Sequence, residues 1–331
     1  MTAKRFLHVA NGTSTTMTIA AAGISGTLSI WADPMYDGPV PGGLSDDELI
    51  DVRAGFLAWP DNNPADVVDE LKRWRGVISS DTAYDELVLW FEHDLFDQLN
   101  LIQLLDWIRD HSPGNRIVSL ICIGSFPGRP DFKGLGELTP SELAPLLETR
   151  QPVTPAQYAL ASDAWQAFRA PTPEALVRLL QSDTSALPFL APAIRRWFEE
   201  YPWTTDGLAR YERRLLQLAA NGSIELSAIF PRMQDGERSY YITDGSLAEL
   251  AETLSTTTPP LATLVAGESD GPSLLHKTFT LTDDGRDVLN GRVDRVKRYG
   301  IDRWLGGVHL QSGEVMWRWD PTREQLVTTQ A

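Results

Sequence analysis

The chain has 331 residues, of which 42% are hydrophobic and 22% charged, so it has a globular composition and enough length for two or three domains. No apolar run has membrane-spanning length, which excludes a membrane-spanning helix, and the N-terminal residues show no apolar signal region. Cys122 is the single cysteine and lies in an apolar run. We therefore expect a cytoplasmic protein that does not associate with membranes and has no internal disulfide.

The N-terminal part alternates expected strands with expected helices. Continuous apolar runs predict strands at residues 5–10, 26–33, 86–91 and 116–124. Between them, apolar residues recur at three- and four-residue spacing, which is typical of amphipathic helices. Such alternation predicts a parallel, doubly wound sheet. Residues 1–135 are therefore expected to form a Rossmann-like α/β domain.

The pattern changes after residue 135. Residues 136–203 contain four expected helices, with proline at or near their starts, and no evident strand, so they are expected to form a helical linker domain. Residues 204–331 mix helices and strands in an order that resembles a winged-helix region. The C-terminal residues alternate around "QSGE" (311–314), which predicts a terminal β-hairpin.

The chain has a formal net charge of −16 at pH 7, and this charge is unevenly distributed. Residues 33–110 contain eighteen Asp and Glu against five Lys and Arg. Nucleic-acid binding depends on neutralising phosphates with basic side chains, so residues 1–135 are not expected to bind DNA or RNA. Residues 285–303 carry six basic residues against three acidic ones, which makes the C-terminal region the better candidate for contacts with nucleic-acid phosphates.

Polar residues collect where the expected strands end. In parallel sheets, ligands bind outside the carboxyl ends of the strands. The first strand is followed by "NGTSTT", in which Asn11, Gly12 and Ser14 could bind an anion at a helix N-terminus. The same residues are equally typical of a turn and a helix cap. Asp33 ends the second strand, and His8 lies inside the first, where it is either a ligand contact or a core histidine.

The segment "FEHDLFDQ" is the strongest candidate site, because it places a histidine between two carboxylates at the end of the third expected strand. We expect His93 to act in acid–base chemistry, with Glu92 or Asp94 orienting it and raising its pKa. Asp94 and Asp97 are three residues apart on the following helix and could bind a divalent cation. The alternative is a solvated helix start, where acidic residues complement the helix dipole.

Three motifs resemble a known family. "HVANG…S", "WADPMYDGPV" and "LVLWFEHDLFDQLNLI" span residues 8–102 and, together, are similar to the bacterial family called domain of unknown function 1835. Later stretches, among them "FPGRPDFKGLGEL", resemble its longer members. Some members have Asp where this chain has Thr13. The family has no settled activity, so the resemblance implies an α/β domain and a shared polar cluster but no reaction.

Three functions are compatible with these patterns. The first is an enzyme for a small molecule, phosphorylated or nucleotide-like, with an acidic, histidine-containing site; a divalent cation is the only cofactor suggested. The second is a ligand-sensing regulator whose winged-helix-like region binds DNA or another protein. The third is an interaction module without catalysis. We rank them in this order, because unusual polar residues cluster at the strand ends.

Overall fold

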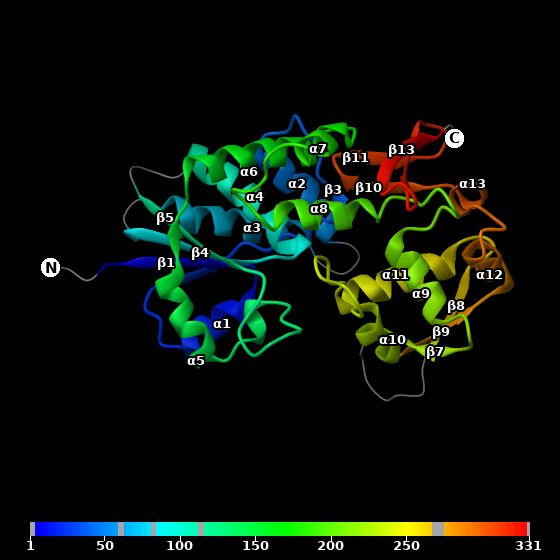
Figure 1. The fold of residues 1–331 in the computed structure, drawn as a ribbon, viewed down its shortest axis with the longest axis horizontal. Helices are drawn as coiled ribbons and strands as arrows, with labels where there is room; N and C mark the ends of the chain where they lie inside the picture. Colours follow the sequence, from blue (N-terminus) through cyan, green and yellow to red (C-terminus); the bar gives the residue numbers. More distant parts are fainter. Residues whose placement is uncertain (1–3, 59–62, 81–83, 112–115, 267–274, 330–331) are drawn as a thin grey trace. The chain divides into compact units, whose positions relative to one another are not determined.

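The computed structural model describes residues 4–58, 63–80, 84–111, 116–266 and 275–329. The chain forms two compact units (Figure 1): unit 1 comprises Met1–Ala193 and Trp304–His309, and unit 2 comprises Ile194–Arg303 and Leu310–Ala331. The boundaries of these units differ from the expected boundaries after residues 135 and 203. The segment expected as a separate helical domain belongs mostly to unit 1, because its longest helix packs on a helix of the N-terminal sheet.

Unit 1 is built on a five-stranded sheet with the order β2-β1-β4-β5-β6. Its strands are β1 (Phe6–Ala10), β2 (Thr27–Ile30), β4 (Glu86–Glu92), β5 (Ile117–Ile123) and β6 (Gln151–Pro152). The first four run parallel, as predicted, and β6 is antiparallel to β5. β6 lies where no strand was expected, since two residues are too short to give a periodic pattern.

The register of the sheet decides which loops meet. Ala10 of β1 pairs with Trp90 of β4, so the residues after these two positions leave the sheet at the same edge. All seven residues of β4 are buried, which agrees with its continuous apolar sequence and with helices covering both faces. Glu92, the last residue of β4, is therefore a carboxylate at the end of a buried strand.

Helices cover both faces of this sheet (Figure 1). One face contacts α1 (Thr13–Ala21), η1 (Leu135–Glu137), α5 (Pro140–Leu143) and η2 (Ala144–Thr149), through a core that includes Ile19 and Leu143. The other helices of unit 1 are α2 (Asp46–Leu57), α3 (Pro64–Ser79), α4 (Leu95–His111), α6 (Pro155–Phe168) and α7 (Glu174–Leu179). α6 packs on α4 and begins at proline behind a Thr154 capping box, as the sequence predicts. Among the residues described, no helix is long and apolar enough to cross a membrane.

The C-terminal strands pair differently from the expected hairpin. β10 (Asp302–Gly306) lies between β11 (Val308–Gln311) and the short β3 (Gly38–Pro39), whereas β12 (Met316–Asp320) pairs with β13 (Gln325–Thr329). The segment 311–314 therefore connects two sheets instead of closing a hairpin. The chain reverses earlier, at Gly306, whose φ of 61° is readily adopted by glycine. Residues 311–314 do form a turn, in which the backbone N–H of Glu314 donates to the carbonyl of Gln311. The predicted hairpin was wrong because alternation identifies strands but not their partners.

Unit 2 combines helices with a small antiparallel sheet. Its elements are α8 (Leu190–Phe198, which starts in unit 1), α9 (Arg210–Leu218), β7 (Ile224–Glu225), α10 (Leu226–Met233), α11 (Asp244–Thr256), β8 (Ala262–Ala266), β9 (Lys277–Leu281), α12 (Asp283–Leu289) and α13 (Arg295–Tyr299). The strand order is β7-β9-β8. Side chains of Thr243 and Thr282 cap α11 and α12.

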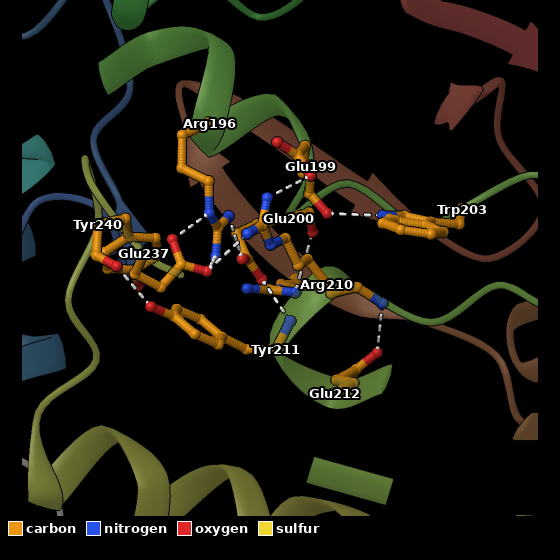
Figure 2. Close-up of polar contacts among 11 residues, drawn as sticks. Arg196, Glu199, Glu200, Trp203, Arg210, Tyr211, Glu212, Glu237 and Tyr240 are labelled. Atoms are coloured by element: carbon orange, nitrogen blue, oxygen red, sulfur yellow. Dashed lines mark hydrogen bonds and ion pairs between the residues drawn. The ribbon is translucent and has the colours of Figure 1, made fainter. Parts of the chain in front are cut away.

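A buried network of charges connects α8, α9 and the loop after α10 in unit 2. Figure 2 shows the Arg196 guanidinium directed at two carboxylates: its Nε donates to Glu237 at 2.8 Å and its Nη1 to Glu200 at 2.7 Å. The guanidinium carbon also lies 4.7 Å from the centre of the Tyr211 ring. Arg196 and Glu200 are both buried, so each charge depends on its partner for compensation.

Candidate functional site

Two buried carboxylates share one amide group at the edge of the central sheet. The Nδ2 atom of Asn11 donates to Glu92 Oε2 and to Asp97 Oδ2, at 2.6 Å in each case. Asn11 directly follows β1, Glu92 ends β4, and Asp97 lies in the first turn of α4. The parallel register of β1 and β4 therefore brings the three residues together. We call Asn11, Glu92 and Asp97 the carboxylate cluster.

The rest of the hydrogen bonding holds this cluster in place. Asp97 Oδ1 accepts from the backbone N–H of Glu92 at 2.8 Å, and the Thr15 hydroxyl donates to Asn11 Oδ1 at 3.3 Å. The second bond turns the NH₂ side of Asn11 toward the carboxylates. The backbone N–H of Leu135 donates to Glu92 Oε1. Both oxygens of Glu92 thus have defined donors.

A glycine-rich loop closes over Glu92. A Cβ atom on Gly134 would lie only 3.0 Å from Glu92 Oε1, and one on Gly136 would lie 2.8 Å from the Ser14 hydroxyl oxygen. Glycine at these positions allows the backbone to approach the carboxylate closely. This loop is the reason why only 2% of Glu92 is exposed.

Burial shifts the protonation of the cluster toward the neutral forms. Burial, with a further contribution from Asp94, raises the pKa of Glu92 to about 7. Burial and the charge of Glu92 raise the pKa of Asp97 well above its usual value. A hydrogen bond between the two side chains lowers the pKa of Glu92 and raises that of Asp97. The neutral form of Asp97 is therefore favoured relative to that of an exposed aspartate, and Glu92 titrates near neutral pH.

His93 and Asp94 lie at the rim of the cluster, and both are half-buried. Asp94 Oδ1 accepts from the backbone N–H of Asp97 at 2.9 Å, so Asp94 caps α4. Burial and the charge of Asp97 raise the pKa of Asp94 well above its usual value. The His93 ring lies between the rings of Phe132 and Phe189, with centroids 6.3 and 6.1 Å away. Glu92, which is expected to orient His93, accepts hydrogen bonds from Asn11 and Leu135.

The expected anion site lies beside the cluster. Gly12 is the first residue before α1, and a Cβ placed on it would meet no atom within 4 Å, so this crossover borders open space. Among described residues, no side chain caps this end of α1. The Ser14 hydroxyl donates to the carbonyl of Gly136 at 3.3 Å and is thus directed at the glycine-rich loop.

Asp33 and His8 do not join the cluster. The Asp33 carboxylate forms a buried ion pair with Arg53, in which Nη2 lies 2.6 Å from Oδ1. His8 is fully buried; its Nδ1 accepts from the Trp90 indole at 3.1 Å, and its Nε2 lies 3.3 Å from the carbonyl of Ser25. Burial lowers the pKa of His8, so the ring is neutral. Both residues have structural partners in place of the expected ligand contacts.

The ion pair of Asp33 leads to a stability prediction. We expect Asp33→Asn to lower the free energy of unfolding by at least about 2 kcal/mol, because it leaves the charge of Arg53 buried with a weaker partner. Urea unfolding measures this loss. Asp47→Asn is the matched control, since its ion pair with Lys72 is exposed and should change stability by less than about 0.5 kcal/mol. Equal effects of the two substitutions would contradict the structural role.

The predicted cation site does not form in this geometry. Within residues 4–329, apart from the undescribed gaps, no group of three His, Cys, Asp or Glu side chains is arranged to hold a metal ion. The oxygens of Asp97 face N–H donors of Glu92 and Asn11, whereas Ca²⁺ and Mg²⁺ require oxygen ligands directed at a common point.

Sequence reasoning missed the loop that completes the site. Leu135 contributes a backbone N–H, and the type of side chain at a position does not indicate such a role. Phe132 and Phe189, which lie beside His93, come from distant parts of the chain. The one available signal was the stretch "FKGLGEL", whose two glycines allow close approach of the backbone.

Comparisons with known proteins add no family assignment. No protein-family model matches the chain, and no curated protein matches it either. The interpretation of the site therefore depends on its geometry.

Proposed function

We propose that the protein is an enzyme that performs acid–base chemistry on a small molecule, with Glu92 as the group that transfers the proton. The observation that carries this proposal is the shared Asn11 amide, 2.6 Å from an oxygen of each of two buried carboxylates. Burying two carboxylates together is costly unless protons neutralise them. Such arrangements separate the pKa values of neighbouring acids, as catalysis requires.

Each residue of the cluster has a distinct role in this proposal. Asp97 keeps its proton and donates a hydrogen bond to Glu92, while Glu92, with a pKa of about 7, exists in both forms at neutral pH. A general acid or base works best when its pKa is near the operating pH. Asn11 and the Leu135 N–H hold the carboxylate of Glu92 in one orientation.

The ligand would reach the cluster from the rim formed by Gly12, His93 and Asp94. Gly12 borders open space, and the other two are half-buried. We propose a Rossmann-like arrangement for unit 1. The position of this rim agrees with it, because ligands of such sheets bind where neighbouring crossovers diverge. The motifs that resemble domain of unknown function 1835 include Asn11 and Glu92, and we propose that members of that family have the same cluster.

The test combines binding with turnover. Small polar metabolites are screened by thermal shift on the full chain at pH 7, and each molecule that binds is incubated with the protein and followed by ¹H NMR. We expect Glu92→Gln to reduce turnover at least about 100-fold while binding persists, which is the usual size of a general acid–base contribution. Turnover that is unchanged in Glu92→Gln would refute the proposal.

A second function is favoured by the order of elements in unit 2. We propose that α9, β7, α10, α11, β8 and β9 form a winged-helix module, since helix, strand, two helices and two strands with the sheet order β7-β9-β8 follow that arrangement. In helix-turn-helix proteins the second helix enters the DNA major groove. The corresponding α11 has exposed Asp244, Glu249 and Glu252 and no Lys or Arg. These charges favour a protein partner over DNA.

The basic residues near the C-terminus do not reverse this preference. Arg292 and Arg295 form ion pairs with Asp287 and Glu212, so part of the positive surplus is neutralised within the chain. We expect the full chain not to bind duplex DNA even at low salt, where electrostatic binding is strongest. Fluorescence anisotropy with labelled DNA measures this, and salt-sensitive binding would restore the DNA-binding alternative.

A further inference from the structure

A cavity of about 380 Å³ lies in unit 1 between the end of β5, the start of α4 and residues 186–189. Its volume falls in the range of pockets that bind small molecules. Most of its wall is formed by Leu, Ile, Ala, Pro and Phe side chains. Five polar residues interrupt this surface: Gln98, Cys122, Thr149, Gln151 and Gln157. None of the lining side chains is charged.

The cavity is distinct from the carboxylate cluster. Asp97 faces Asn11, whereas its neighbour Gln98 lines the cavity, because successive residues of a helix point in different directions. The two places meet at Phe189, which forms part of the cavity wall and packs against His93. A Cβ on Gly124 would lie 2.7 Å from a ring atom of Phe189, so glycine at this position lets the ring form the wall.

The amides of the cavity are already oriented by the protein. Gln98 is buried, and its Nε2 donates to the carbonyl of Glu92 at 2.6 Å, so Oε1 is the atom that this amide offers to a ligand. Gln157 Oε1 accepts from the backbone N–H of Thr154 at 2.8 Å, so Nε2 is the atom that it offers. The cavity therefore presents one acceptor and one donor between apolar walls.

The remaining polar groups are neutral or lie near solvent. Burial raises the pKa of the Cys122 thiol far above neutral pH, so it is uncharged. Thr149 and Gln151 are exposed and form the outer part of the wall. A charged group that entered the cavity would lose its hydration, and the described wall has no opposite charge to compensate for this loss. The cavity therefore favours an uncharged ligand. Hydroxyl groups at its outer end would find hydrogen-bonding partners.

We propose that this cavity binds an uncharged nucleoside-type ligand. The flat base has adjacent donor and acceptor atoms on its edge, which complement Gln98 and Gln157, and its faces fit between aliphatic and aromatic walls. The sugar hydroxyls lie at the outer end, near Thr149 and Gln151. The described wall has no positive charge that could stabilise a phosphate group, so a nucleoside binds at least as tightly as its monophosphate.

Isothermal titration of the full chain with adenosine, guanosine, cytidine and uridine tests this proposal. We expect at least one of them to bind with a Kd below about 1 mM, with its monophosphate no tighter. Because binding is measured, the result is independent of proton transfer at Glu92. Absence of saturable binding for all four, or tighter binding of the monophosphate, would overturn the proposal.

Two variants locate the ligand. Gln157→Glu keeps the oxygen that caps α6 but replaces the Nε2 donor with a charge, so we expect binding to weaken at least about ten-fold with an unchanged melting temperature. Ala186→Trp places a large ring in the wall from a half-buried position and should abolish binding. Wild-type affinity in both variants would show that the nucleoside binds elsewhere.

Discussion

Glu92→Gln should remove a pH dependence of about 2 to 3 kcal/mol from the free energy of unfolding between pH 5 and pH 8. The ordinary pKa of a glutamate is 4.5, whereas that of folded Glu92 is about 7. Between these values the folded state binds more protons than the unfolded state, so stability falls as pH rises through this window. A glutamine at position 92 does not titrate. The free energy of unfolding of the variant should therefore increase relative to that of the wild type as pH rises.

Urea unfolding at several pH values measures this difference. Any fixed effect of the substitution on the hydrogen bonds of Asn11 cancels when the two proteins are compared across pH. Glu148→Gln, which changes an exposed carboxylate of η2, is the matched control and should parallel the wild type. Parallel profiles for Glu92→Gln and the wild type would mean that Glu92 ionises normally.

Arg196→Met should lower the free energy of unfolding of unit 2 by about 3 to 5 kcal/mol. The substitution roughly preserves side-chain volume but removes the charge that faces Glu200 and Glu237, and both carboxylates are 4% exposed in their side chains. Arg210 still pairs with Glu237 at 2.9 Å, so Glu200 loses most. Hydrogen exchange of peptides covering α9, measured by mass spectrometry, reports the loss.

Two further variants separate charge from packing in this network. Arg292→Met removes an exposed ion pair and should cost less than about 1 kcal/mol. Adding Glu200→Gln to Arg196→Met should recover part of the loss, because the uncompensated carboxylate is then absent. An Arg196→Met protein as stable as the wild type would show that the buried charges do not depend on Arg196.

The sequence predicted the four parallel strands and the polar residues that follow them. Continuous apolar runs identified the strands, and the rule that parallel strands end at one edge related Asn11 to Glu92. Asp33 was expected to end the second strand; it lies just beyond β2, and its carboxylate pairs with Arg53 of α2. Periodicity predicts the face of a helix that is buried, and it does not identify an arginine on that face as a partner.

The role of His93 was assigned from its chemistry and from its place between two carboxylates at the end of a strand, and it stays a prediction. The pKa of histidine in solution is well suited to proton transfer at neutral pH. In the folded chain, burial raises the pKa of Glu92 to about 7, and the rings of Phe132 and Phe189 lie beside the His93 ring. Whether a single residue is buried depends on loops such as residues 132–137. No local sequence pattern predicts how such a loop packs.

The most direct test is the titration of the Glu92 side-chain carboxyl carbon by ¹³C NMR, with the signal assigned by its absence in Glu92→Gln. The proposed acid–base role requires a midpoint near pH 7, because burial beside Asp97 and Asp94 disfavours the charged form. We expect that midpoint in the full chain. A midpoint at or below about pH 5, where exposed glutamates titrate, would contradict the proposed role.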